Sequence, residues 1–311
     1  MTTTHAVLGA NGVVGRETIT ALRARGHAVS AVARSPHEFA GVTSVIADLR
    51  DAASTMNALQ GADVAYLTVG LPYTSKAWHR DWPRIMQNTI EACVVHGTRL
   101  VYFDNVYVYG KTDAPMTEST PIRPCSKKGA VRAALLRTLE TAARERGLDV
   151  TIGRSADFYG PGASTSAFNM FVIDKVAEGK ALVWLFDSHQ PHSMTYTPDI
   201  GEALAVLGSD ERARGRVWHL PTAPALTGVE YLELATGGTL AHKTMSAATM
   251  RVGALFVAEA RETLEMAYQY TAPYVFDSSA FQSTFGLAPT AYRDGIAAAL
   301  GRAGVATRSV R

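Results

Sequence analysis

Short apolar segments alternate with amphipathic ones through the first half of the chain. An apolar run without polar alternation is typical of a strand buried on both faces, whereas a period of three to four residues indicates a helix. The apolar runs predict a strand that leads into the glycine-rich segment 6–15, and further strands at 27–33, 43–47, 63–69 and 99–103. The amphipathic stretches predict helices at 17–25, 51–60 and 76–96.

This order of elements predicts an α/β fold built on a Rossmann-type doubly wound parallel sheet, with helices on both faces. Ligands of such sheets bind at the carboxyl ends of the strands. The segments expected to carry the function are therefore those that follow strands, namely 9–15, 34–36, 48–49, 69–73, 104–110 and 155–162.

The alternation weakens beyond residue 161. A helical stretch at 168–178 precedes strand-like stretches at 183–186 and 193–197, and Pro198 suits the first turn of a further helix. Later elements are expected at 216–220, 229–235 and 247–270, followed by short helices as far as 301. We therefore expect a Rossmann domain at 1–155 and a smaller C-terminal α/β domain at 156–311, with segments that return to the sheet.

The composition of the 311 residues excludes several classes of protein. A net charge of +2 with both signs mixed indicates neither a nucleic-acid partner nor a membrane surface. The two cysteines, Cys93 and Cys125, are far apart, and His192, His219 and His242 have no metal-ligand spacing, so no metal is expected. The early first strand leaves no room for a signal peptide, and no apolar run could span a bilayer. We expect a cytoplasmic protein.

The sequence AVLGANGVVG at 6–15 places Gly9, Gly12 and Gly15 between the first strand and the first helix. In a nucleotide-binding loop, the first glycine allows the tight turn and the second lets the backbone approach a diphosphate at the helix N-terminus. The third lets helix and strand pack closely. The alternative is an ordinary glycine-rich turn. On the cofactor interpretation, the remaining contacts of the loop come from Asn11, Val13 and Val14.

The segment Ala33-Arg34-Ser35-Pro36, directly after the second strand, contains no acidic residue to accept from a ribose 2′-hydroxyl. Arg34 lies there instead, and its guanidinium could hold a 2′-phosphate, which favours NADP(H) over NAD(H). Arg34 could equally be a solvated loop residue. After the third strand, Asp48-Leu49 is expected beside the adenine, although Asp48 could also cap the next helix. Val69-Gly70 would flank the ribose.

Further motifs follow in order along almost the whole chain. They are Asp48-Leu49, Asn88, Val108-Tyr109-Gly110, Arg154 with Tyr159-Gly160-Pro161-Gly162, Asp199-Ile200, and Asp277-Ser278-Ser279 with Phe285-Gly286. With the glycine loop, this series resembles the extended short-chain dehydrogenase/reductase superfamily, in its NAD(P)-dependent epimerase/dehydratase branch. The resemblance implies NAD(P) binding in the first domain and substrate binding in the second.

The chain departs from the family where the chemistry is expected. The family uses a Ser or Thr, a Tyr, and a Lys four residues after that Tyr. The corresponding residues here are Asn105, Lys128 and Arg132, and a substrate-contacting Asn of the family becomes Asp157. The resemblance therefore implies a catalytic site that lacks the usual phenol acid. Tyr107, two residues after Asn105, is a second candidate acid, although it could be a packed aromatic.

Lys128 and Arg132 are four residues apart and share one helix face, with Ser126 as the expected N-cap. A lysine in the first turn opposes the helix dipole, so it indicates a nearby anion or a functional demand. Alternatively, Lys127 and Lys128 are both solvated. On the functional interpretation, Lys128 faces the substrate as a proton donor or acceptor, and Asp157 pairs with it or caps a turn.

Further substrate contacts are expected from Leu71, Tyr73 and Tyr159, the first two of which belong to an aromatic-rich stretch. These features favour an NADP(H)-dependent oxidoreductase, or an epimerase-like isomerase, that acts on a small organic molecule by hydride transfer. The alternative is a catalytically silent NADP(H)-binding redox sensor. By analogy with the family, a homodimer could form through the helices at 76–96 and 126–146.

Overall fold

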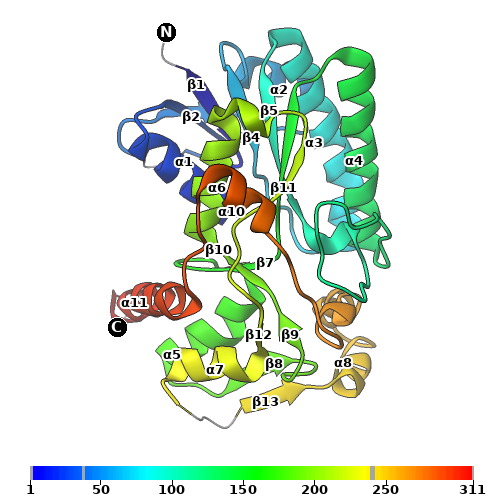
Figure 1. The fold of residues 1–311 in the computed structure, drawn as a ribbon, viewed down its shortest axis with the longest axis vertical. Helices are drawn as coiled ribbons and strands as arrows, with labels where there is room; N and C mark the ends of the chain where they lie inside the picture. The colour runs from blue at the N-terminus through cyan, green and yellow to red at the C-terminus, as the bar shows by residue number, and fades with distance from the viewer. Residues whose placement is uncertain (1–2, 37–38, 239–241, 310–311) are drawn as a thin grey trace.

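A seven-stranded parallel sheet forms the centre of the computed structural model, which describes residues 3–36, 39–238 and 242–309 (Figure 1). The strand order is β11-β6-β5-β4-β1-β2-β3. The strands are β1 (Thr4–Leu8), β2 (Ala28–Ala33), β3 (Thr43–Ile46), β4 (Val64–Leu67), β5 (Arg99–Asn105), β6 (Val150–Ser155) and β11 (Val217–His219). The order reverses between β1 and β4, and ligands of such sheets bind at the carboxyl edge beside this reversal. The predicted Rossmann-type α/β fold is confirmed.

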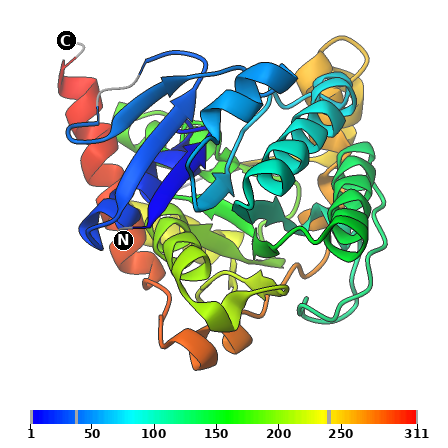
Figure 2. The same cartoon turned by 90° about the horizontal axis from the view of Figure 1, so that it is seen from above.

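Helices cover both faces of the sheet (Figure 2). On one face, α1 (Val13–Ala24) packs against α6 (Thr197–Ser209). The other face carries α2 (Ala52–Ala58), α3 (Ser75–His96) and α4 (Lys127–Arg146), of which α3 and α4 lie side by side. The central strands are therefore buried on both faces, which explains their continuous apolar sequences.

Local capping signals determine where several helices begin. Ser126 accepts a hydrogen bond from the Gly129 amide at 3.0 Å and is the N-cap of α4, as predicted. The N-cap of α2 is Asp51, which accepts from the Ser54 amide at 2.7 Å, so Asp48 does not have that role. Helix α1 begins at Val13, four residues earlier than expected, because the glycine loop leads directly into it.

Most of the chain after residue 155 forms a second, smaller unit below the sheet in Figure 1. Its strands include β8 (Leu182–Leu185), β9 (Pro191–His192), β12 (Leu226–Thr227) and β13 (His242–Met245). Its helical segments are η2 (Asn169–Ile173, a π-helix), α5 (Asp174–Glu178), α7 (Gly228–Thr236), α8 (Ala247–Gly253), α9 (Ala258–Leu264) and α11 (Tyr292–Ser309). Helix α6, strand β11 and helix α10 (Ser279–Phe285) return to the sheet.

Two expectations for this half were wrong in detail. The stretch 247–270 is not continuous, because it divides into α8, α9 and a short 3₁₀ turn at Ala267–Gln269. The last helix, α11, is 18 residues long and is therefore not one of a series of short helices. In the described residues, no helix is long and apolar enough to cross a membrane.

A buried network joins the ends of β5, β6 and β11. Asp104 is fully buried and accepts from Arg154 Nε at 3.0 Å. Arg154 also contacts the Tyr109 hydroxyl, which donates to His219 Nε2 at 2.6 Å. His219 Nδ1 in turn donates to the Asp277 carbonyl at 2.7 Å. Burial, aided by the charge of Arg154, lowers the pKa of His219 to about 3, so this histidine remains a neutral acceptor.

We predict that Asp104→Asn lowers the free energy of unfolding by about 3 kcal/mol, because it leaves buried guanidinium groups without a counter-charge. Arg132 also lies 3.9 Å from Asp104, which adds to this effect. Urea denaturation measures the change. The matched control is Asp149→Asn, which breaks the half-exposed ion pair with Arg214 and is expected to cost less than about 1 kcal/mol. Equal effects of the two substitutions would contradict the prediction.

Candidate active site

The glycine loop connects β1 to α1 with no room for side chains at two of its positions. Gly9 has a φ of +93°, and a Cβ there would lie 2.8 Å from the Cα of Val69. A Cβ on Gly15 would lie 2.4 Å from the Gly9 carbonyl oxygen. Only glycine satisfies both positions. Gly12 and Gly70, in contrast, are exposed.

The N-terminus of α1 is available to an anion. Its N-cap residue, Gly12, provides no side-chain cap, and the first turn contains no acidic residue. Asn11 donates from Nδ2 to the carbonyl and the hydroxyl of Ser35, at 3.2 and 3.1 Å, which ties the loop to the turn after β2. Its Oδ1 atom is buried without a partner among the described residues. The uncapped helix and the side-chain-free cradle fit a dinucleotide diphosphate, whereas the unpartnered Asn11 oxygen, an acceptor, fits a hydroxyl or amino group of the same ligand.

The turns after β2 and β3 flank this loop. Asp48 forms a two-point ion pair with Arg50, and those hydrogen bonds lower the pKa of Asp48 to about 2. Asn88 of α3 donates to the Leu49 carbonyl at 2.9 Å and so positions the turn after β3. Arg34 is exposed at the end of β2, close enough that its charge also acts on Asp48.

Two tyrosine hydroxyls meet at the carboxyl edge of the sheet. The hydroxyls of Tyr73 and Tyr107 lie 3.0 Å apart, and the ring of Tyr107 stacks on Trp78 at 6.2 Å. Asn105 accepts from the Tyr107 amide at 3.2 Å, which places its side chain in a backbone cap. Burial, followed by the neighbouring Tyr73 and Asp157, raises the pKa of Tyr107 well above its usual value. Tyr107 is therefore held as a protonated phenol.

Lys128 is fully buried, whereas Lys127 is exposed. The Nζ atom of Lys128 donates to the Glu262 carboxylate, to the Glu262 carbonyl at 3.3 Å and to Glu265 Oε2 at 3.5 Å. It also lies 4.6 Å from the centre of the Tyr73 ring. The solvated alternative is thus wrong for Lys128, and its ammonium group is already occupied by two carboxylates.

The two carboxylates that bind Lys128 also accept hydrogen bonds at the starts of α3 and α4. Glu262 accepts from the Ser75 amide at 2.9 Å and from the Ser75 hydroxyl at 2.8 Å, at the start of α3. Glu265 accepts from the Lys128 amide at 3.1 Å, at the start of α4. Although burial opposes it, the hydrogen bonds from Lys128 and Ser75 lower the pKa of Glu262. The anions expected near the α4 N-terminus are therefore side chains of this same chain, Glu262 in α9 and Glu265 directly after it.

Arg132 points into the aromatic core beneath the site. Its guanidinium lies 4.3 Å from the Trp82 ring centre and 5.0 Å from that of Trp78, and it donates to the Tyr102 hydroxyl. Only 6% of the residue is exposed. Tyr159 is buried as well, among Phe168, Tyr196 and Tyr292 of the second unit. In this arrangement both side chains fill a core, and their predicted site roles remain untested.

Asp157 does not pair with Lys128. It lies on β7 (Asp157–Tyr159), which pairs with β10 (Met194–Tyr196). Its Oδ2 atom accepts from His192 Nε2 at 3.1 Å and from the Tyr270 hydroxyl at 3.0 Å. The rings of His192 and Tyr270 stack at 4.4 Å. Sequence reasoning missed both partners, because they come from 35 and 113 residues further along the chain and belong to no local motif.

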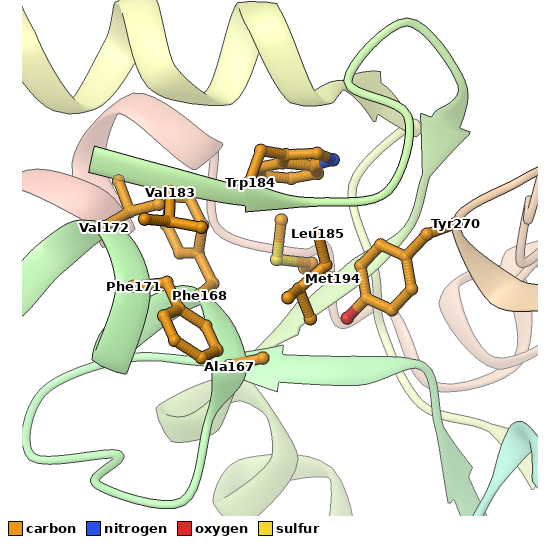
Figure 3. Close-up of a pocket in the computed structure, with 9 residues that line it drawn as sticks. All are labelled: Ala167, Phe168, Phe171, Val172, Val183, Trp184, Leu185, Met194 and Tyr270. Atoms are coloured by element: carbon orange, nitrogen blue, oxygen red, sulfur yellow. The ribbon is translucent and has the colours of Figure 1, made fainter. Parts of the chain in front are cut away.

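Tyr270 also borders a small apolar cavity of about 20 Å³ (Figure 3). The cavity lies in the second unit, between η2 and β8. Its lining side chains are Ala167, Phe168, Phe171, Val172, Val183, Trp184, Leu185, Met194 and Tyr270. Leu71, another expected substrate contact, is half-buried in the first unit and packs against the core there. Tyr270 thus contacts both Asp157 and the cavity.

The sheet order, the uncapped α1 N-terminus and the glycine cradle define a dinucleotide-binding Rossmann enzyme. The model of the NAD-dependent epimerase/dehydratase family matches residues 5–220, more than half of the chain. The protein belongs to this family of extended short-chain dehydrogenases/reductases.

Individual relatives agree with this assignment. The chain is 30% identical to a dTDP-4-dehydrorhamnose reductase of Streptomyces griseus over 247 residues, 75% of this chain and 71% of the relative. A dTDP-glucose 4,6-dehydratase from Streptomyces venezuelae, solved with NAD bound, has a TM-score of 0.81 at 19% identity and 98% coverage of both chains. A UDP-glucose 4-epimerase from Thermus thermophilus, in complex with NAD, has a TM-score of 0.76 at 18% identity, covering 96% of this chain and 98% of its own. These two structures support the fold.

We predict that Lys128→Met lowers the free energy of unfolding by about 3 kcal/mol, because it leaves two partly buried carboxylates without their cation. Lys127→Met is the matched control at the adjacent, exposed position and should stay within about 0.5 kcal/mol of the wild type. Thermal and urea unfolding measure both variants. A Lys128→Met protein as stable as the control would show that the ion pairs do not stabilise the fold.

Proposed function

We propose that the protein is an NADP(H)-dependent oxidoreductase, or an epimerase-like isomerase, that acts on a small organic molecule by hydride transfer with a non-standard acid. The observation that carries this proposal is the combination at one sheet edge of a side-chain-free dinucleotide cradle and the hydroxyl pair of Tyr73 and Tyr107. Lys128 and Arg132 are both engaged in buried contacts. We therefore assign the proton transfer to Tyr107.

When bound, the cofactor supplies or accepts a hydride. The N-terminus of α1 would hold its diphosphate, and Arg34 would hold its 2′-phosphate. In the direction of reduction, the substrate oxygen takes the proton of the Tyr107 hydroxyl. Tyr73, whose hydroxyl lies 3.0 Å away, then returns a proton to the Tyr107 oxygen and regains one from solvent, to which its side chain is exposed.

The family is described as NAD-dependent, whereas the exposed Arg34 after β2 favours NADP(H). We predict that NADPH binds more tightly than NADH. Arg34→Ala should weaken NADPH binding by about ten-fold to a hundred-fold and leave NADH binding unchanged, because one charge-assisted contact contributes about 1.5–3 kcal/mol. Titration of nicotinamide fluorescence measures all four affinities.

The control for this titration is Arg144→Ala, which removes an exposed arginine from α4. It should bind NADPH like the wild type. Preferential binding of NADH by the wild type would overturn the choice of cofactor, and failure to bind either would overturn the whole proposal.

The relatives named above act on dTDP-linked or UDP-linked sugars. A substrate screen should therefore combine dTDP- and UDP-linked keto sugars with simple carbonyl compounds. On the substrate so found, we predict that Tyr107→Phe lowers kcat by about 10²–10⁴-fold, because the variant lacks the proton donor. Tyr196→Phe, in the second unit, is the matched control and should retain normal turnover. Unchanged kcat in Tyr107→Phe would exclude Tyr107 as the acid.

A redox sensor is the second candidate, and the engagement of Lys128 and Arg132 in internal contacts favours it. A sensor should discriminate strongly between NADP⁺ and NADPH without turnover. An enzyme should bind both forms within a modest ratio. The titration described above, extended to the oxidised cofactor, distinguishes the two candidates.

Homodimerisation through α3 and α4 remains a prediction. These helices share a groove of about 480 Å³. Its lining includes Gln87, Ile90, Ala134 and Thr138. A surface of this kind supports contact with a second copy, and the molar mass in solution tests it.

A further inference from the structure

The ring of His192 lies between two hydrogen-bond acceptors. Its Nδ1 atom is 3.1 Å from the Gln269 carbonyl oxygen, and its Nε2 atom is 3.1 Å from Asp157 Oδ2. A neutral imidazole has one N–H and can donate to only one of these atoms. Only 1% of His192 is exposed, so water does not compensate for a missing hydrogen bond. Both contacts are satisfied when both ring nitrogens carry hydrogen.

The alternative is a neutral His192 with the proton on Asp157. The Tyr270 hydroxyl argues against it, because that hydroxyl donates to the same Oδ2 atom, at 3.0 Å. Burial and the charge of Asp157 raise the pKa of Tyr270 well above its usual value, so Tyr270 keeps its hydrogen. An oxygen that accepts from two donors is better described as a carboxylate oxygen than as a carboxylic O–H.

The other groups around His192 do not change this assignment. The rings of Tyr270 and Tyr274 stack on its faces at 4.4 and 5.9 Å. Tyr231 donates to the His192 backbone carbonyl. Among the described residues, Asp157 is the charged side chain that hydrogen-bonds to the His192 ring. A buried imidazolium is tolerated when its partner carboxylate neutralises it.

We propose that Asp157 and His192 form a lasting ion pair that presents an ionised carboxylate oxygen to the substrate. The oxygen presented is Asp157 Oδ1, which has no hydrogen bond to the described residues, on a side chain that is 22% exposed. Such an oxygen accepts from an O–H or N–H group and repels an anion. His192 is a positioning residue, because it holds Asp157 without reaching the substrate.

The class of ligand follows from the chemistry of Asp157 Oδ1. The oxygen selects a hydroxyl or amine group, whereas the cavity of about 20 Å³ beyond Tyr270 has a mostly apolar lining and is no larger than a water molecule needs (Figure 3). We therefore expect a ligand that presents a hydroxyl or amine group to this oxygen. This identification of the ligand rests on the proposed function, because it assumes that the substrate binds at the same sheet edge.

The test is the protonation state of His192 in full-length protein labelled with ¹⁵N-histidine, recorded by NMR at pH 7.5. His192 should retain hydrogen on both ring nitrogens. His5 and His219 serve as internal references for neutral rings, because burial lowers their pKa values to about 4 and about 3. Asp157→Asn should cost His192 one of its two ring hydrogens. Asp113→Asn, at an exposed loop position, should change nothing.

A wild-type His192 with a single ring hydrogen would overturn the proposal, whether or not Asp157→Asn folds. The acceptor is tested in the same sample with cyclohexylamine, cyclohexanol and cyclohexanecarboxylate, which share one apolar ring. The amine and the alcohol should shift the His192 resonances at concentrations at least ten-fold below those needed for the carboxylate. Equal shifts from all three, or none, would overturn the acceptor assignment. A separate NADPH titration of the wild-type sample reports on the proposed function independently.

Discussion

The buried ammonium group of Lys128 determines how the second unit meets the sheet. A charge without solvent contact needs a counter-charge, and Glu262 and Glu265 supply it from 134 and 137 residues further along the chain. The same carboxylates accept hydrogen bonds at the starts of α3 and α4. One interaction therefore holds the α9 region of the second unit against the carboxyl ends of the strands, and the shape of the candidate site depends on it.

The other buried cations near this edge are likewise neutralised from within the protein. Arg154 and Arg132 share Asp104, and Arg132 is enclosed by aromatic rings. Neither guanidinium is presented to a ligand. Among the described residues at this edge, the tyrosine hydroxyl pair and Asp157 Oδ1 can take part in further hydrogen bonds. On the proposed function, this distribution leaves the tyrosine pair and Asp157 as the groups available to a substrate.

Much of the fold could be predicted because its causes are local. An apolar run makes a buried strand wherever it lies in a parallel sheet, and Ser126 caps α4 through a contact only three residues long. The structure of the segment 247–270 was harder to predict. Its division into α8 and α9 reflects packing on distant elements, and its carboxylates bind Lys128 and Ser75. The candidate site divides in the same way. The glycine loop could be recognised from the sequence, whereas the burial of Lys128 between two glutamates could not.

The fold class and the glycine loop could be predicted because each depends on residue types at short spacing. Which side chains are engaged in internal contacts is a property of the folded chain alone. The tertiary structure buried Lys128 between two glutamates, turned Arg132 into an aromatic core and brought His192 and Tyr270 to Asp157. Residues that are 30 to 137 positions apart make those contacts, and their energies depend on burial and on the charge of the partner, neither of which a local pattern records.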